Sequence, residues 1–170
     1  AGEAEIGPEG RKLEDRVRSI AESYGLRIVG PNCLGFIRPA NHLNVTFVHV
    51  APPEGRIAFF SQSGALGTAI LDWAAANQVG FSAFVSVGSM CDVDFGDLID
   101  YFGADPHTSS IILYIESITE ARHFMSAARH FAKTKPIIVV KSGRHARSAL
   151  AAASHTGAIA GDDTLYSAVF

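Results

Sequence analysis

The sequence predicts an α/β fold built on a doubly wound parallel sheet. Four short runs rich in valine, isoleucine and phenylalanine occur at residues 57–60, 81–87, 111–115 and 137–140, and helical patterns separate them. Strands that are apolar on both faces are typical of parallel sheets covered by helices on both sides. Right-handed crossovers then place the helices on the two faces of one sheet. A fifth strand is expected just beyond Phe170.

The first part of the chain carries one clear helix and a weaker pattern. Apolar residues recur at helical spacing across residues 7–25, after a proline suited to the first turn and before a terminal glycine. This stripe consists of Leu13, Val17, Ile20, Ala21 and Tyr24. A short apolar strand is expected at 26–29, followed by a turn-rich segment at 30–35. Residues 36–53 show no strong period, and the Pro-Pro-Glu-Gly run at 52–55 indicates a linker or domain boundary.

The elements after residue 56 follow one another regularly. The first strand runs into a Ser-Gln-Ser-Gly turn and then a helix. The expected buried face of this helix is Leu66, Ala69, Ile70, Trp73 and Ala74. A short helix is expected at 94–102, and residues 117–120 match a capping box that opens a helix through Phe131. Pro136 stands at the start of the last strand, where a proline is tolerated.

Composition excludes several classes of protein. The chain has 170 residues, 48% of them hydrophobic and 18% charged, and its net charge of −3 gives no reason to expect nucleic-acid or membrane-surface binding. It contains no apolar run of membrane-spanning length and no signal-peptide pattern. Cys33 and Cys91 make neither a metal-ligand spacing nor a disulfide framework, so we expect a cytoplasmic protein. The chain begins without methionine, and Phe170 lies inside a helical pattern, so we expect a piece of a larger protein.

Two candidate site segments follow strands of the sheet. The turn at 61–67 lies between a strand and a helix, where free N–H groups and the helix dipole favour an anion. A helix cap and tight turn without a ligand explain it equally well. Glu116 ends the strand at 111–115 and is suited to orient a histidine, or is simply a solvated carboxylate. Carboxyl ends of parallel strands meet at one edge, so we expect the two segments to converge there.

A third segment contains a histidine. His155 lies in a run of small residues, 153–163, just ahead of an expected helix start. Neutral imidazole is nucleophilic near neutral pH, and small residues let a ligand approach the backbone. A flexible, solvated loop is the alternative. If this loop reaches the same sheet edge, a phosphorylated histidine there would face N–H donors of helix N-termini.

Two charged clusters have simpler interpretations. A basic loop follows the last strand and either steers phosphate toward the edge or is only solvated; it consists of Lys141, Arg144, His145 and Arg147. The acidic residues after the second strand fit helix capping and a polar helix face, and we assign no metal to them; they are Asp92, Asp94, Asp97 and Asp100.

Taken in order, five motifs resemble those of the NDP-forming acyl-CoA synthetases, the relatives of succinyl-CoA synthetase and of ADP-forming acetate–CoA ligase. Each is weak alone, but their shared order along almost the whole chain is specific. They are Gly30-Pro31-Asn32-Cys33-Leu34-Gly35, Ser61-Gln62-Ser63-Gly64-Ala65-Leu66-Gly67, Ile115-Glu116-Ser117, Lys135-Pro136-Ile137 and Ser154-His155-Thr156-Gly157-Ala158-Ile159-Ala160-Gly161.

The resemblance implies a reversible reaction in which acyl-CoA, phosphate and ADP give the free acid, CoA and ATP. His155 then matches the histidine that carries the phosphoryl group, and Glu116 matches the glutamate that hydrogen-bonds it. Asn32 and Cys33 match a segment near the thiol end of coenzyme A. The residues matched to phosphate binding are Ser63, Gly64, Ala65, Thr156 and Gly157.

The resemblance also implies an organisation. Residues 1–50 would be the end of a Rossmann-like CoA-binding domain plus a linker, and residues 51–170 a flavodoxin-like phosphohistidine domain that stops before its last strand. ATP or ADP and Mg²⁺ would bind an ATP-grasp domain or subunit that the chain lacks, so the chain alone should not turn over. An oligomer is expected, and the acyl group stays open.

Two alternatives remain. Some members of the superfamily are fused to a protein lysine acetyltransferase, and in some of these the histidine is replaced and the synthetase part only senses acyl-CoA. His155 is present here, which favours the ligase. A flavodoxin-like FMN-binding domain fits the architecture, because fold does not determine function, but it leaves the expected meeting of His155 and Glu116 unexplained.

Overall fold

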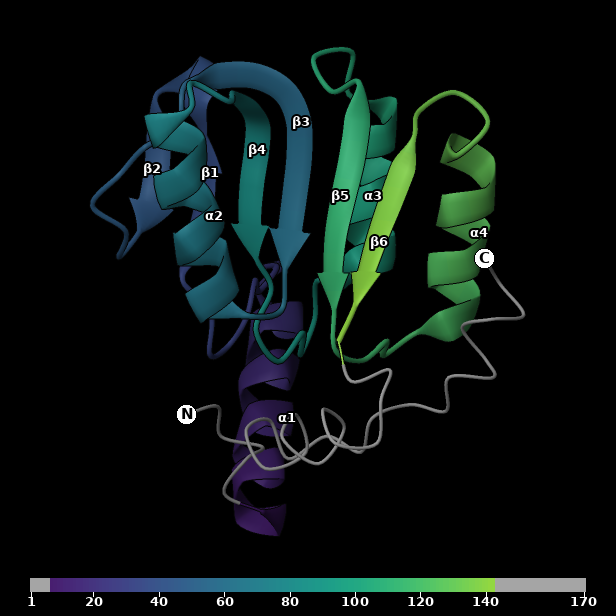
Figure 1. Ribbon diagram of the computed structural model, residues 1–170. Coiled ribbons are helices and arrows are strands. Elements are labelled where there is room, and N and C mark those ends of the chain that lie inside the picture. The colour runs from purple at the N-terminus through teal and green to yellow at the C-terminus, as the bar shows by residue number, and fades with distance from the viewer. Residues whose placement is uncertain (1–6, 143–170) are drawn as a thin grey trace.

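The computed structural model describes residues 7–142. The elements are α1 (Pro8–Ser23), β1 (Gly35–Arg38), the 3₁₀ turn η2 (Pro39–Asn41), β2 (Leu43–Thr46), β3 (Glu54–Ser61), α2 (Gly64–Ala76), β4 (Phe81–Ser86), α3 (Phe95–Ala104), β5 (Ser110–Ile115), α4 (Ala121–Phe131) and β6 (Ile137–Lys141). The six-stranded sheet carries α2 on one face and α3 and α4 on the other, with α1 beyond one edge (Figure 1).

The sheet has the order β2-β1-β4-β3-β5-β6. Strands β3, β4, β5 and β6 pair in parallel, which confirms the predicted fold class. Their carboxyl ends point to one edge, the lower one in Figure 1, and α1 lies beyond that edge. Ligands of open α/β sheets bind at this kind of edge, so it is the first place to look for a site.

The core consists of two layers, one on each face of the sheet. Neighbouring residues of β3 show the alternation: Phe59 packs with Leu71 of α2, whereas Phe60 packs with Phe102 of α3 and Phe124 of α4. Every residue of β4 is buried, as expected for a central strand covered on both sides. The loops at the carboxyl edge therefore follow strands that are packed on both faces.

The four predicted strands are confirmed, but the N-terminal segment was predicted incorrectly. Residues 26–29 form no strand. The backbone of Ile28 bonds the loop after β4 instead: its N–H donates to the Asp92 carboxylate at 2.7 Å, and its carbonyl accepts from Val93 N–H at 3.0 Å. A short apolar run next to a polar partner thus finds its hydrogen bonds outside the sheet.

Strands β1 and β2 were missed because residues 36–53 lack a clear alternation. They form an antiparallel hairpin, and β1 joins the sheet beside β4. The expected division between residues 1–50 and 51–170 stays a prediction. In the structure, however, residues 35–46 already belong to the same sheet as the later strands.

The buried face of α2 is rotated from the predicted one. Gly67, Leu71 and Ala74 are its buried residues, whereas Trp73 is 57% exposed. The reason is the close approach of the helix to the sheet at Gly67, where a Cβ would lie 2.8 Å from the ring of Phe84. Gly67 faces the strand, but the prediction counted only apolar side chains and therefore did not place glycine on the buried face.

Helix α1 forms as predicted, but most of its apolar stripe is exposed. Leu13, Val17, Ile20 and Tyr24 are 46% to 77% exposed, and Ala21 is the stripe residue that is buried. No helix in residues 7–142 combines the length and apolarity needed to cross a membrane.

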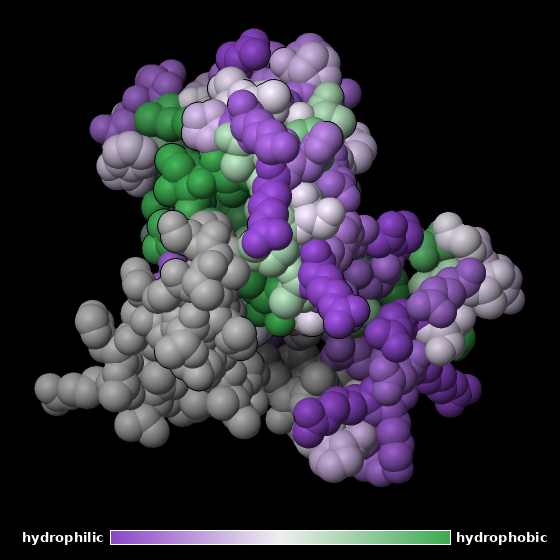
Figure 2. Space-filling view, turned by 90° about the vertical axis from the view of Figure 1, so that its right-hand side faces the viewer, coloured by the Kyte–Doolittle hydropathy of each residue, from purple (hydrophilic) through white to green (hydrophobic). Residues whose placement is uncertain are grey.

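Strand β6 is the edge strand at the other end of the sheet from β2, and its residues Ile138 and Val140 are half-exposed. Figure 2 views this side of the molecule and shows hydrophobic surface beside a mainly hydrophilic one. The fifth strand predicted just beyond Phe170 stays a prediction.

Candidate functional site

The turn between β3 and α2 is built to present N–H groups at the carboxyl edge. Ser63 is the N-cap of α2, and its side chain accepts a hydrogen bond from Leu66 N–H at 3.3 Å. The buried Ser61 hydroxyl donates to the Ser63 carbonyl at 2.8 Å and tightens the turn. The N–H groups of Gly64 and Ala65, in the first turn, have no partner inside the helix. These groups and the helix dipole suit an anion.

The turn after β5 carries Glu116 and lies beside the first turn. The two are joined through Gln62: its side-chain oxygen accepts from Glu116 N–H at 2.7 Å and from Ser117 N–H at 2.9 Å. Its amide group also donates to the Ser117 hydroxyl at 3.1 Å. The expected convergence of these two segments is therefore confirmed for the described residues.

The capping box predicted at residues 117–120 is wrong. Helix α4 begins at Ala121, and its N-cap Glu120 makes no side-chain capping hydrogen bond. Ser117 bonds Gln62 instead. The tertiary partner outcompetes the local one because Gln62 satisfies two N–H groups of this turn at once. Sequence reasoning missed Gln62; a long amide directly after a buried strand was the available signal.

Segment 30–35 packs on the amino end of α2. Its Leu34 side chain contacts Gly64, and its Leu34 N–H donates to the Ser86 hydroxyl at 3.0 Å. Asn32 has a φ of 54°, in the left-handed region that asparagine tolerates. Cys33 is half-buried, with its sulfur 3.4 Å from the Val29 carbonyl. The structure thus places Leu34, which directly follows Asn32 and Cys33 in the sequence, beside the turn that contains Ser63, Gly64 and Ala65.

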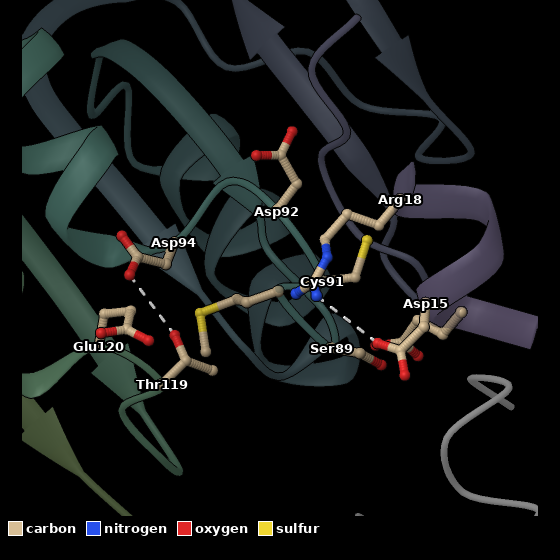
Figure 3. A pocket seen from close by; sticks show the side chains of 10 residues that line it. Asp15, Arg18, Ser89, Cys91, Asp92, Asp94, Thr119 and Glu120 are labelled. Carbon is tan, nitrogen blue, oxygen red and sulfur yellow. Dashed lines mark hydrogen bonds and ion pairs between the residues drawn. The ribbon is translucent and has the colours of Figure 1, made fainter. Parts of the chain in front are cut away.

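A pocket with a volume of about 270 Å³ opens at the same edge, on the side of α3 and α4 (Figure 3). It lies between α1, the loop after β4 and the turn after β5. Two pairs of lining residues interact with each other. Arg18 and Asp15, one turn apart on α1, form an ion pair at 3.7 Å, and the Thr119 hydroxyl donates to the Asp94 carboxylate at 3.5 Å. The lining residues are Glu14, Asp15, Arg18, Ser89, Met90, Cys91, Asp92, Asp94, Thr119 and Glu120.

Electrostatics make the thiol in this pocket a poor nucleophile. Burial raises the pKa of Cys91, and the carboxylates of Glu14 and Asp92 raise that pKa further. Burial of Asp92 acts to raise its own pKa, but hydrogen bonds from Arg27 and from Ile28 N–H outweigh it and lower the pKa. Asp92 therefore stays ionised, and the Cys91 thiolate is disfavoured at neutral pH.

The acidic residues of α3 act mainly as helix caps, as predicted. Asp94 and Asp97 form a reciprocal capping box, with N···O distances of 3.0 and 3.1 Å. His123 adds a third group whose ligand atom lies within 4.8 Å of theirs. Its ring bonds Asp100 at 2.9 Å, which raises the pKa of His123. All three side chains have protein partners in the structure, and we assign no metal to them.

Several predicted site residues lie outside the described residues. They are His155, Thr156 and Gly157 in the small-residue segment, and Arg144, His145 and Arg147 in the basic loop. Lys141, predicted to belong to the same loop, is described and is the last residue of β6. Its ammonium group donates to the Glu116 carbonyl at 2.9 Å and to the Ser142 carbonyl at 2.7 Å. One cation of the predicted basic loop thus contacts the Glu116 turn.

Comparison with known proteins gives consistent matches. The family model of the succinyl-CoA ligase-like flavodoxin domain matches residues 54–170. The alpha subunit of ADP-forming acetate–CoA ligase I of Pyrococcus furiosus is 45% identical over 170 residues, 100% of this chain and 37% of that subunit. The ADP-forming 4-hydroxybutyrate–CoA ligase of Nitrosopumilus maritimus is 39% identical over 173 residues, 99% of this chain and 25% of that protein.

A solved structure is similar over nearly the whole chain. Acetyl-coenzyme A synthetase 1 of Candidatus Korarchaeum cryptofilum, determined in complex with phosphate and ADP, aligns with a TM-score of 0.90 and 42% sequence identity. The alignment covers 98% of this chain and 36% of that one. The chain thus spans between about a quarter and somewhat more than a third of the length of these relatives.

Proposed function

Because the chain belongs to the family of the succinyl-CoA ligase-like flavodoxin domain, we propose that it carries the phosphoryl-relay centre of an ADP-forming acyl-CoA ligase. The proposed overall reaction converts acyl-CoA, phosphate and ADP into a carboxylic acid, CoA and ATP. The observation that carries the proposal is the junction at the carboxyl edge, where the turn of Glu116 is hydrogen-bonded to the turn that begins α2.

Each group has a role in the relay. The neutral His155 ring attacks the phosphorus of an acyl phosphate, the bond from phosphorus to the acyl oxygen breaks, and the carboxylate leaves. Glu116 orients the ring and stabilises its cationic form. The N–H groups at Ser63, Gly64 and Ala65, with those of Thr156 and Gly157, donate hydrogen bonds to the phosphoryl oxygens as charge develops. ADP then takes the phosphoryl group from the histidine.

Substrates and partners follow from the same family. Asn32 and Cys33 directly precede Leu34, whose side chain lies against Gly64 of the α2 turn, which supports an approach of the coenzyme A thiol there. ADP or ATP with Mg²⁺ would bind an ATP-grasp domain or subunit, and we propose an oligomer in the cytoplasm. The relatives named above act, by their names, on acetate and on 4-hydroxybutyrate, so the substrate is proposed as a class, a carboxylic acid.

Phosphoenzyme labelling tests the proposal. The full-length protein, with its nucleotide-binding domain or subunit, is incubated with Mg²⁺ and ATP labelled at the γ-phosphate, and acid-labile, alkali-stable label is measured. We expect label in the wild type, none in His155→Ala and slower labelling in Glu116→Gln. His107→Ala is the matched control, because His107 is exposed and precedes β5, at the opposite edge of the sheet.

Two outcomes contradict the proposal. Label that persists in His155→Ala would show that another residue carries the phosphoryl group. Absence of label from the folded wild-type protein would exclude the relay, and the next experiment would measure acyl-CoA binding and test for an appended lysine acetyltransferase.

A further inference from the structure

Gln62 occupies the junction of the candidate site, and its backbone N–H and both polar ends of its side chain bond the same neighbouring strand and turn. Its backbone N–H donates to the Tyr114 carbonyl at the end of β5. Its side-chain oxygen accepts from the N–H groups of Glu116 and Ser117, and its amide nitrogen donates to the Ser117 hydroxyl. One half-buried residue thus spans from the end of β3 to the end of β5, across 54 positions of sequence.

The orientation of the Gln62 amide is determined by its partners. Two backbone N–H groups can only donate, so the oxygen of the amide must face them and the nitrogen must face the hydroxyl. The 2.7 and 2.9 Å distances are those of well-formed N–H···O hydrogen bonds, the first at the short end of the usual range. The side chain is therefore held in one orientation rather than free to rotate.

The peptide groups flanking Glu116 are held from two sides. Gln62 accepts from its N–H, while the Lys141 ammonium donates to its carbonyl at 2.9 Å. The backbone that carries the Glu116 side chain is thus fixed relative to both neighbouring strands, β3 and β6. Movement of this residue requires at least one of these hydrogen bonds to break.

An amide is the side chain that suits this junction. A glutamate at position 62 would accept from the same N–H groups but would add a negative charge beside Glu116 and close to the proposed phosphate site. Methionine would match the volume but would accept poorly, leaving two N–H groups without their partner. Asparagine would keep the amide but is one methylene shorter.

We propose that Gln62 is a positioning residue of the phosphoryl relay: it holds the Glu116 backbone at a fixed place beside the amino end of α2. The inference rests on the proposed function, in which Glu116 orients the phosphorylated histidine. In this role Gln62 contacts neither the histidine nor the phosphate and acts only through Glu116.

The test compares Gln62→Met with the wild type in the full-length protein with its nucleotide-binding domain or subunit. The readouts are the rate of labelling by ATP, kcat and KM for acyl-CoA, and the melting temperature. We expect labelling and kcat to fall about 10- to 100-fold, as for a small misplacement of a catalytic group, with KM unchanged. Gln78→Met is the matched control, because the side chain of Gln78 is exposed and, within residues 7–142, bonds its own helix end, at the Ala75 carbonyl.

A double-mutant cycle separates positioning from a structural role. If Gln62 acts through Glu116, the double variant Gln62→Met, Glu116→Gln is no slower than Glu116→Gln alone. Losses that multiply, or a loss of rate that only follows the loss of folded protein, would overturn the inference. Gln62→Asn carries the same comparison if the methionine variant fails to fold.

The two proposals fail in different ways. If Glu116→Gln slows labelling and Gln62→Met does not, the positioning role is refuted and the relay stands. If Glu116→Gln labels at the wild-type rate, the proposed role of Glu116 is refuted and the positioning role falls with it.

Discussion

Replacing Gly67 by alanine tests how tightly α2 packs on the sheet. A Cβ at this position would lie 2.8 Å from Cζ and 3.1 Å from Cε2 of Phe84. The Phe84 ring is fully buried and packs against Phe59 at a centroid distance of 5.8 Å, so it has no room to turn away. The helix must therefore move outward by about 0.7 Å to reach a normal carbon contact of about 3.5 Å.

Two opposing effects determine the free energy of unfolding of Gly67→Ala. Alanine is favoured over glycine in a helix interior by about 1 kcal/mol. Overpacking of a well-packed core costs about 1 to 3 kcal/mol, and the immobile ring places this site toward the middle of that range or above. We therefore expect a net destabilisation of about 1 kcal/mol, which lowers the melting temperature by about 2 to 4 °C for a protein of this size.

Urea denaturation measures this difference directly. The midpoint of Gly67→Ala should fall while the slope m stays the same, because the unfolded state is unchanged. Gly64→Ala is the control: its Cβ would meet only the flexible end of Leu34, at 3.3 to 3.7 Å, and its stability should stay within about 0.5 kcal/mol of the wild type. A Gly67→Ala variant as stable as the wild type, or more stable, would refute the close packing.

Three further predictions concern other parts of the fold. Asp94→Ala removes the N-cap and capping box of α3 and should lower the free energy of unfolding by about 1 to 2 kcal/mol in urea denaturation; no change would mean that water replaces the cap. Thr108→Val removes a buried hydroxyl 2.8 Å from the Ser82 hydroxyl and should cost about 1 to 3 kcal/mol, checked by thermal unfolding. Asp100 raises the pKa of His123, so this pair stabilises the fold fully below the unfolded-state pKa of about 6.5; the contribution is lost as pH rises through the folded-state pKa. His123→Gln should accordingly lower the free energy of unfolding more at pH 5.5 than at pH 9. An equal loss at both pH values would show that the His123–Asp100 pair does not stabilise the fold.

The central strands were predictable because burial on both faces leaves a strong local pattern. Residues 111–115 are a continuous apolar run, and residues 81–86 are apolar except for two small serines; the structure buries residues 81–86 completely. The hairpin at 35–46 left no such pattern. Its β2 strand lies at the sheet edge with mostly exposed residues, so its sequence was not required to alternate apolar and polar residues.

The candidate site was predictable in its parts but not in its connections. Parallel strand ends must share an edge, and this rule alone brings Ser63 and Glu116 toward each other. It says nothing of Gln62, whose importance comes from partners 54 and 55 positions away. The same limit explains why Ser117 was expected to cap α4: the local pattern contains no information about Gln62, its distant hydrogen-bond partner.

The sequence by itself determined the fold class, the carboxyl edge as the place of the candidate site and, through ordered motifs, the family. These depend on local periodicity and on residues read one segment at a time. Only the tertiary structure decided which face of α2 is buried, where residues 26–46 lie, and that Gln62 joins the two turns. The physical reason is that each of these depends on contacts between distant segments, such as Gly67 against Phe84, whose energies no local pattern contains.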